Sequence, residues 1–265
     1  MDQGSGPNPD DAHLTQLTED ALTQTIRLTL EKSKKDDVAR AVLYFLVRVA
    51  NSWRSTCALW TFLAGSHPET FMVDVGTLVR AMYEAYLQAA FILHEQARQR
   101  ERARLYLDYE HVEKRIVLGK IFKHDTFVSR ALKRSSLLPT SEVRMEAQYD
   151  RVKDRYLNQK RREIHDKWYE GTLRDLANAI GEKADYDFFM SAFHGYVHSS
   201  AFAIRTGPPF QPRDVMTIVS FLASKVAHLA IARFGLQLQP EQQAVIEANC
   251  RTPLLQRAAD TDSGA

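Results

Sequence analysis

Three polar residues, Arg80, Glu84 and His198, have the side chains and the setting for acid–base chemistry. Arg80 and Glu84 interrupt a predicted helix that is apolar on two faces, so we expect that helix to be largely buried. A buried charge is costly unless a partner satisfies it. The order Arg before Glu at i,i+4 is the weaker one for pairing within a helix. We therefore expect the pair to meet other helices or a ligand. An ion pair that ties helices together is the structural alternative.

His198 belongs to a second polar segment, His194 to Ser200. A histidine titrates near neutral pH and can abstract or deliver a proton when a polar partner holds it. His194 and His198 share a helix face, as two metal ligands would, but no Glu follows His194, so the zincin pattern is missing. A metal-dependent hydrolase is therefore a minor alternative beside a solvent-facing polar stripe. We predict no metal and no cofactor.

Charge is unevenly distributed along the chain. The whole sequence carries a net charge of +2, whereas residues 98–167 hold 19 basic and 11 acidic side chains. Such a basic region can bind an anionic partner through phosphate contacts and counterion release. RNA bound through region 98–167 is therefore one candidate partner, and a second copy of the chain in a homodimer is another. A solvated face on long surface helices is the plain alternative.

Composition excludes several classes of protein. With 45% hydrophobic and 26% charged residues, the chain is ordinary for a soluble globular protein. Its two cysteines, Cys57 and Cys250, exclude a secreted disulfide framework and a four-cysteine zinc module, so we predict a cytoplasmic location. The most apolar stretch, residues 215–232, contains Lys225 and His228, so we expect a buried core helix and no membrane partner.

Apolar residues recur at intervals of three and four, which predicts helices throughout. We predict an all-α fold, a single helical bundle domain of about eight to ten helices, over residues 13–250, with disordered tails at 1–12 and 251–265. We expect helices over about 13–34, 37–65, 69–95, 98–123, 139–166, 172–181, 185 to beyond 198, 213–234 and from 240. Asp36 or Asp37 and Thr172 are the expected N-caps, and Gly235 is the expected helix stop.

Four short motifs, in order and spacing, carry a family resemblance. They read LVRAMYEAY at 78–86, RARLYLDY at 102–109, WYEGTLRDLA at 168–177 and YVHSS at 196–200. Together they resemble an uncharacterised bacterial family, domain of unknown function 5677, over about residues 52–233. The resemblance implies that Arg80, Glu84 and His198 form the functional centre.

That family is distantly similar to the HEPN superfamily, helical domains that often act as metal-independent ribonucleases in toxin and phage-defence systems. In HEPN ribonucleases an arginine stands a few residues before the essential histidine. Here Ser191, Ala192 and Phe193 fill those positions, so Arg80 or Arg205 would have to supply the cation.

Our leading hypothesis is a HEPN-like ribonuclease in which His198 is the general base on a ribose 2′-hydroxyl. Arg80 would stabilise the pentavalent phosphate, and Glu84 would orient either group. The alternative is a non-catalytic ligand-binding or protein-interaction module, in which the same polar cluster recognises a ligand or fixes helix packing.

Overall fold

The structure is a computed structural model that describes residues 9–63, 67–123, 126–127, 130, 142–158, 163–165, 167–197 and 211–251. Nine α-helices lie in the described part of the chain, with two short strands, so the all-α prediction is confirmed. The helices are α1 (Pro9–Ser33), α2 (Asp37–Leu63), α3 (Pro68–His94), α4 (Gln99–Lys123), α6 (Glu142–Val152), α7 (Leu173–Ala179), α8 (Lys183–Val197), α10 (Pro212–Phe234) and α11 (Pro240–Arg251).

The chain forms two compact units. The first contains residues 1–99 and 172–265, and the second contains residues 100–171. The first unit therefore holds α1, α2, α3, α7, α8, α10 and α11, and the chain leaves it once and returns. Of the predicted tails, 1–12 and 251–265, residues 1–8 and 252–265 lie outside the described residues, whereas 9–12 and 251 are helical. Helix α1 already begins at Pro9, four residues before the expected start.

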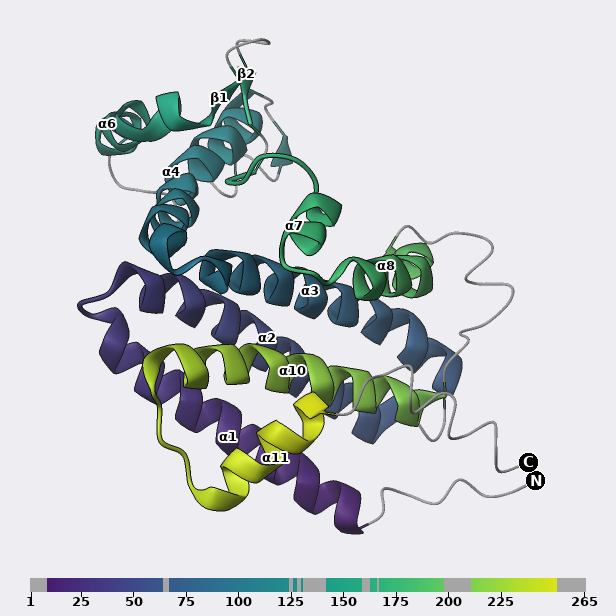
Figure 1. Cartoon of the computed structure of the whole chain (residues 1–265). Helices are drawn as coiled ribbons and strands as arrows, with labels where there is room; N and C mark the ends of the chain where they lie inside the picture. Colours follow the sequence, from purple (N-terminus) through teal and green to yellow (C-terminus); the bar gives the residue numbers. More distant parts are fainter. Residues whose placement is uncertain are drawn as a thin grey trace. The chain divides into compact units, whose positions relative to one another are not determined.

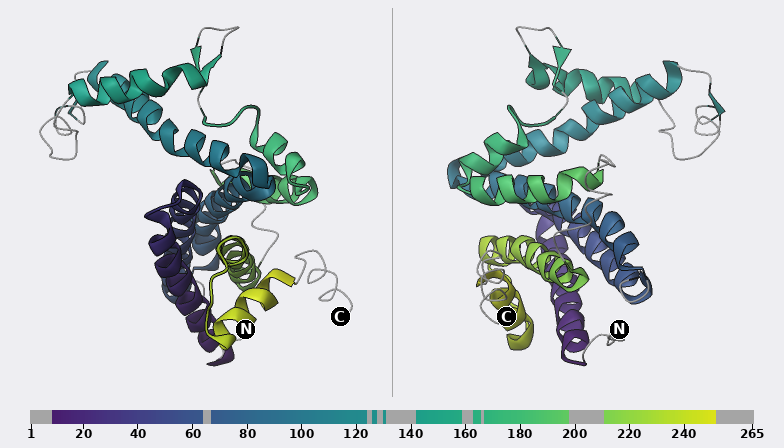
Figure 2. Two further views of the ribbon diagram at one scale, coloured as in Figure 1. Left: turned by 60° about the vertical axis from the view of Figure 1, so that its left-hand side comes forward. Right: turned by 90° about the vertical axis from the view of Figure 1, so that its right-hand side faces the viewer.

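Helices α2, α3 and α10 form the core of the first unit, where each contacts the other two (Figure 1). Their buried side chains recur at helical spacing, so each helix turns an apolar face inward. On α2 the buried set includes Val38, Val42, Phe45, Leu46, Val49 and Trp53. Helices α1 and α11 pack against α10 and against each other (Figure 2). Truncating a core aromatic such as Phe45 to alanine would cost about 3–5 kcal/mol.

Helix α3 is apolar on two faces, as its sequence predicts, although Val73 on the second face is 41% exposed. Phe71, Val75, Val79 and Met82 on one face are fully buried, and so is Leu87 on the other. Helices α2, α7, α8 and α10 all contact α3, which accounts for that burial. The charged pair on α3 therefore lies on a helix that is covered on most sides.

Three helix ends follow their local sequence. The Asp36 carboxylate accepts a hydrogen bond of 2.8 Å from the Val38 N–H at the start of α2. Thr172 and Asp175 form a reciprocal capping box at the start of α7. At the end of α10, Gly235 adopts φ 59°, in the left-handed region that a residue with a Cβ enters only with strain. The predicted caps and stop are confirmed at these positions.

The second unit corrects one prediction. A long basic helix from 139 to 166 is wrong: α6 ends at Val152, and Lys153–Tyr156 forms a 3-10 turn. Strands β1 (Leu157–Asn158) and β2 (Glu163–Ile164) then pair antiparallel. Tertiary hydrogen bonds explain the break, because the Tyr156 hydroxyl donates to the Leu105 carbonyl on α4 at 2.6 Å. Pairing with α4 has outweighed the helical propensity of the segment.

Helix α10 is long and apolar enough to cross a membrane by length and composition. However, 61% of its apolar window is buried inside the structure, as expected for a core helix. Length and hydropathy alone are therefore weak grounds for a membrane span in α10.

Candidate functional site

Arg80 and Glu84 pair with each other on α3. The Arg80 Nε donates to Glu84 Oε1 at 3.0 Å, and the two side chains are 19% and 23% exposed. The weaker order therefore does not prevent the two side chains from pairing within the helix, and their partial burial, which removes much of the competing water, favours the pair. The two groups form a half-buried ion pair that still reaches solvent.

His198 lies outside the described residues, and so does the side chain of His194. Helix α8 begins at Lys183 and ends at Val197, the residue before His198. The solvent-facing polar stripe that we expect to contain His194 and His198 also includes Asp187 and Ser191, and both of these are exposed. Asp187 accepts a hydrogen bond of 3.1 Å from Arg174 on α7.

Helix α8 packs against α3 in the antiparallel direction. Glu182, just before α8, accepts a hydrogen bond of 2.6 Å from the Tyr86 hydroxyl. Further along α8, the Phe189 ring stacks on Tyr83 with ring centroids 4.2 Å apart. Residue numbers rise along α8 as they fall along α3. The C-terminal half of α8 therefore runs toward the half of α3 that contains Arg80.

A second polar cluster, around Glu182, lies where α3 packs against the start of α8. Its Oε1 accepts hydrogen bonds from the Tyr86 hydroxyl at 2.6 Å and from Lys225 Nζ at 3.0 Å. The Lys225 ammonium also lies 4.9 Å from the centre of the Tyr86 ring and 5.4 Å from that of Phe221. This Glu182 cluster joins α3, the start of α8 and α10.

Asp185 adds a second carboxyl to the Glu182 cluster. Burial, a hydrogen bond to Glu182 and the charge of Glu182 raise the pKa of Asp185 to about 6. Burial also opposes ionisation of Glu182, but hydrogen bonds from Asp185 and Tyr86 and the charge of Lys225 hold the pKa of Glu182 below its usual range. The two carboxyls therefore share one proton under mildly acidic conditions, with Glu182 as the ionised partner.

The Tyr83 hydroxyl is a polar group without a hydrogen-bond partner in the described structure. Its side chain is buried, and its oxygen meets no donor or acceptor there. Burial and the nearby charges of Asp185 and Glu182 raise the pKa of Tyr83 well above its usual range, so the phenol stays protonated. An unsatisfied buried hydroxyl lowers stability, because it loses its hydrogen bonds to water without replacement.

Sequence reasoning did not predict the Glu182 cluster. One signal was available, because Lys225 is a charge inside the apolar segment of α10 and a buried charge needs a partner. Which carboxylate satisfies it depends on tertiary packing, since Glu182 and Lys225 are 43 residues apart. The tyrosine that completes the cluster could not be distinguished from its apolar neighbours by type or spacing.

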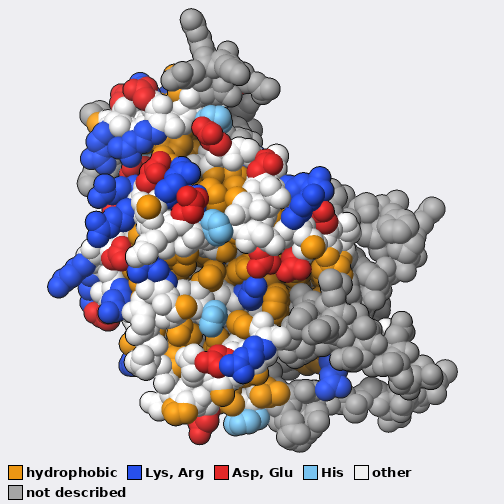
Figure 3. All heavy atoms as spheres, viewed as in Figure 1, with side chains coloured by type: hydrophobic (Ala, Val, Ile, Leu, Met, Phe, Trp, Pro, Cys, Tyr) orange, Lys and Arg blue, Asp and Glu red, His pale blue; other side chains and the backbone are white. Residues whose placement is uncertain are grey.

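The second unit carries a basic surface. Figure 3 shows Lys and Arg side chains gathered over α4 and α6. Some are paired locally: Arg115 contacts Glu146 at 2.5 Å, and Arg155 contacts Asp108. All four of these side chains are between 26% and 52% exposed, so the positive charge stays near solvent, where phosphates could reach it.

Within the described residues, no group of three or more His, Cys, Asp or Glu side chains is arranged to hold a metal ion.

Residues 39–206 match the model of a family of unknown function, DUF5677. The chain belongs to this family. The match includes Arg80, Glu84 and His198, and also Glu182 and Asp185, whereas Lys225 lies outside it. Membership of DUF5677 assigns no activity to any of these residues. Searches of curated proteins and of solved structures gave no match. The homodimer and the cytoplasmic location stay predictions.

Proposed function

We propose that this chain is a metal-independent, HEPN-like ribonuclease whose centre combines Arg80, Glu84 and His198. His198 takes the proton of a ribose 2′-hydroxyl, and the 2′-oxygen attacks the adjacent phosphorus. The P–O5′ bond breaks, and the leaving 5′-oxygen takes up a proton. The products are a 2′,3′-cyclic phosphate and a 5′-hydroxyl end. Arg80 stabilises the charge that develops on the phosphate oxygens, and Glu84 orients Arg80.

The direction of α8 is the observation that carries this proposal. The contacts of Glu182 with Tyr86 and of Phe189 with Tyr83 fix the antiparallel course. The helix that leads into His198 is therefore directed toward the part of α3 that holds Arg80 and Glu84. This course of α8 supports a centre that draws on α3 and on the residue that follows α8.

The state of the Arg80–Glu84 pair also supports the proposal. Glu84 fixes the guanidinium through Nε, and the two side chains are 19% and 23% exposed. A cation fixed before the reaction and partly shielded from water stabilises developing negative charge better than a freely moving one. Substrate affinity would come from the basic region 98–167, whose phosphate contacts are independent of base sequence.

Purified full-length protein and a labelled single-stranded RNA in EDTA test the proposal. We expect cleavage that leaves 2′,3′-cyclic phosphate ends, and no cleavage of the same RNA with 2′-O-methyl groups. His198→Ala should slow cleavage by about a hundredfold or more, because general base catalysis supplies that much. His228→Ala is the matched control, since His228 is an exposed histidine on α10.

Two results would contradict ribonuclease activity. Folded wild-type protein could leave the RNA intact, or His198→Ala could cleave as fast as the wild type, which would identify a contaminating nuclease. Dependence on an added divalent metal would instead support the minor alternative with His194 and His198.

A non-catalytic ligand-binding or interaction module is the second candidate. One observation favours it: Arg80 is paired with Glu84, and Tyr86 and Lys225 are both satisfied by Glu182. Polar groups that satisfy one another can serve packing alone. Intact RNA together with strong destabilisation by Arg80→Ala would identify this second function.

A further inference from the structure

A pocket separate from the α3 centre opens among α1, α2, α10 and α11 in the first unit. Its volume is about 610 Å³, within the range of about 300–1,000 Å³ typical of small-molecule sites. Trp53 and Trp60 of α2, Met216 of α10 and Val245 of α11 contribute apolar surface. Trp53 is almost fully buried, and Trp60 is held by an edge contact with Phe71 at 5.6 Å between ring centroids. The pocket therefore offers fixed aromatic walls.

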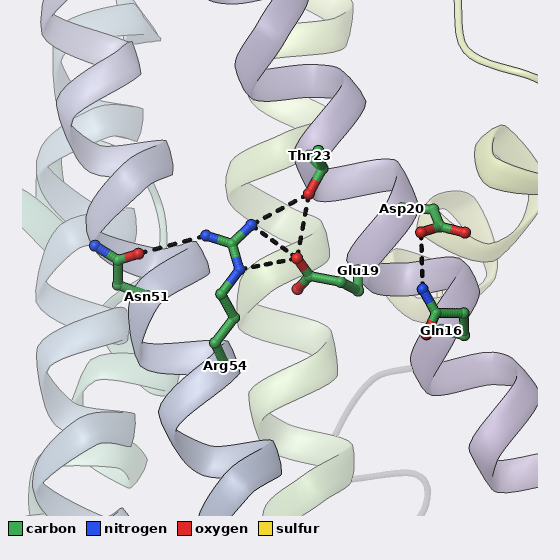
Figure 4. Close-up of polar contacts among 6 residues, drawn as sticks. All are labelled: Gln16, Glu19, Asp20, Thr23, Asn51 and Arg54. Carbon is green, nitrogen blue, oxygen red and sulfur yellow. Dashed lines mark hydrogen bonds and ion pairs between the residues drawn. The ribbon is translucent and has the colours of Figure 1, made fainter.

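An acidic group lies in the lining of this pocket. Among the described residues, Glu19 of α1 makes its polar contacts through one carboxylate oxygen, Oε1, which accepts from Arg54 Nε at 2.8 Å and Thr23 Oγ1 at 3.1 Å and lies 2.7 Å from Arg54 Nη2 (Figure 4). Arg54 is also bound by Asn51 and Thr23. The second oxygen of Glu19, Oε2, is buried and has no hydrogen-bond partner among the described residues. A buried carboxylate oxygen without a donor is costly, so a ligand that brings a donor would gain free energy there.

Four hydroxyl groups of the lining present acceptors rather than donors. Thr18, Thr61, Thr217 and Ser220 all line the pocket. Each donates its proton to a backbone carbonyl four residues earlier in its own helix, at 2.9, 3.0, 3.3 and 2.8 Å respectively. Each of these hydroxyl oxygens keeps its lone pairs, which can accept a hydrogen bond from a ligand. The lining is therefore rich in hydrogen-bond acceptors.

The field of Glu19 extends into the pocket even though Arg54 is nearby. Burial and the negative charge of Glu19 raise the pKa of the Cys57 thiol, another lining group, to about 12. The thiol is therefore neutral at physiological pH and is not a nucleophile. The second cation in the lining, Arg213, is exposed, so solvent screens its charge.

We propose that this pocket binds a small organic ammonium ion with an aromatic body. The ammonium donates to the Glu19 carboxylate and to the hydroxyl oxygens of Thr217 and Ser220, and the ring packs against Trp60 and Met216. Glu19 Oε2 is closed to solvent in the free protein, so the carboxylate rotates about its last side-chain torsion to meet the ligand. That torsion is intrinsically broad, and the hydrogen bonds from the ligand offset the contacts with Arg54 and Thr23 that the rotation disturbs.

Two probes of matched size and opposite charge test this proposal: 2-phenylethylammonium and 3-phenylpropionate. Each is titrated into the full-length protein, and binding is followed by calorimetry and tryptophan fluorescence. Two of the three tryptophans line the pocket, whereas Trp168 lies in the second unit. We expect saturable binding of the cation and at least about tenfold weaker binding of the anion, the ratio that one charge-assisted hydrogen bond supplies.

Glu19→Gln keeps the shape of the side chain and removes its charge, so it should weaken binding of 2-phenylethylammonium by about tenfold. Glu247→Gln is the matched control, because Glu247 of α11 pairs with Arg251 and is not part of the lining. Trp60→Leu, which removes the aromatic wall, is the second variant in case Glu19→Gln does not fold. It should also weaken binding of the cation.

Three results would overturn the proposal. The cation could fail to bind at millimolar concentration, the anion could bind as tightly as the cation, or folded Glu19→Gln and Trp60→Leu could both keep wild-type affinity. Loss of ribonuclease activity in His198→Ala is independent of all three, so this proposal and the proposed function can fail separately.

Discussion

Helix α3 carries two polar clusters that differ in how they are made. The Arg80–Glu84 pair lies within one helix, four residues apart, at 19% and 23% exposure. The Glu182 cluster joins three elements, and its ion pair with Lys225 is similarly exposed, at 24% for Lys225 and 18% for Glu182. The two ion pairs are buried to a similar degree, but one lies within a single helix and the other joins separate helices, so we expect them to have different roles. A local pair adds little to the fold, whereas a cluster between helices holds them in place.

This difference separates chemistry from architecture. We expect the Arg80–Glu84 pair, which lies within one helix, to tolerate substitution without unfolding of the protein, as a role in the proposed reaction would allow. Groups that connect helices α3, α8 and α10 cannot be changed so freely. Stability and activity should therefore respond to different substitutions on the same helix, and the predictions that follow test this division from the largest expected effect to the smallest.

Lys225→Met should have the largest effect on stability. It removes the cation from the Glu182 cluster and leaves the Glu182 carboxylate half-buried without its charge partner. We expect a loss of about 2–3 kcal/mol in the free energy of unfolding, measured by urea denaturation. Arg174→Met is the control, because the Arg174–Asp187 pair is 56% and 48% exposed and should contribute at most about 0.5 kcal/mol. Equal effects of the two substitutions would contradict a structural role for Lys225.

Tyr86→Phe and Tyr83→Phe form a matched comparison. The Tyr86 hydroxyl donates to Glu182 at 2.6 Å, so its removal should cost about 1–2 kcal/mol. The Tyr83 hydroxyl has no hydrogen-bond partner in the described structure, so its removal should leave stability unchanged or raise it. Thermal melting of the two variants measures both effects. A larger loss for Tyr83→Phe would show that its hydroxyl has an important partner.

Asp185→Asn should change how stability depends on pH. The folded pKa of Asp185, about 6, is raised above the ordinary value of 3.8. The folded state therefore binds more protons between these values, and wild-type stability falls as pH rises through this range. Asparagine does not titrate, so the stability of the variant relative to the wild type should rise from about pH 4 to about pH 6. Above about pH 6 the difference in stability should stay constant.

Melting temperatures over this range of pH check the sign. A stability difference between Asp185→Asn and the wild type that does not vary with pH would contradict a shared proton. Asp187→Asn is the control, because Asp187 is exposed and pairs with Arg174.

Arg80→Ala should have the smallest effect on stability. The ion pair that it forms with Glu84 lies within one helix and both side chains reach solvent, so we expect a loss of at most about 1 kcal/mol by urea denaturation. A loss of about 3–5 kcal/mol, as for a fully buried ion pair, would instead identify a structural pair. That outcome would favour the interaction module over the ribonuclease.

The sequence was informative where the determinants are local. Apolar spacing predicted the helices, and Thr172 and Gly235 predicted two of their ends, because caps depend on a few neighbouring residues. The prediction of a helix over 139–166 was wrong because the Tyr156 hydroxyl donates to the Leu105 carbonyl of α4, 51 residues away. No local sequence pattern contains such a contact. The order of Arg80 and Glu84 left open whether they pair with each other, because the preference was measured on exposed helices and this face is half-buried.

The candidate site was predicted in the same uneven way. Arg80 and Glu84 were identifiable because they are charges in an apolar helix. The Glu182 cluster and the pocket lined by Glu19 were not, because their residues meet only after helices pack. The contribution of His198 rests on its type and on the course of the helix before it.

The most direct test of the division between the two clusters compares the RNA-cleavage rates of Arg80→Lys and Lys225→Met. Both are measured at a temperature at which both variants are fully folded. Arg80→Lys keeps the charge but loses the planar guanidinium, so the account predicts a loss of about a hundredfold or more. Lys225→Met should cleave at the wild-type rate. Wild-type cleavage by Arg80→Lys, with lost cleavage in folded Lys225→Met, would contradict the account and transfer the active centre to the Glu182 cluster.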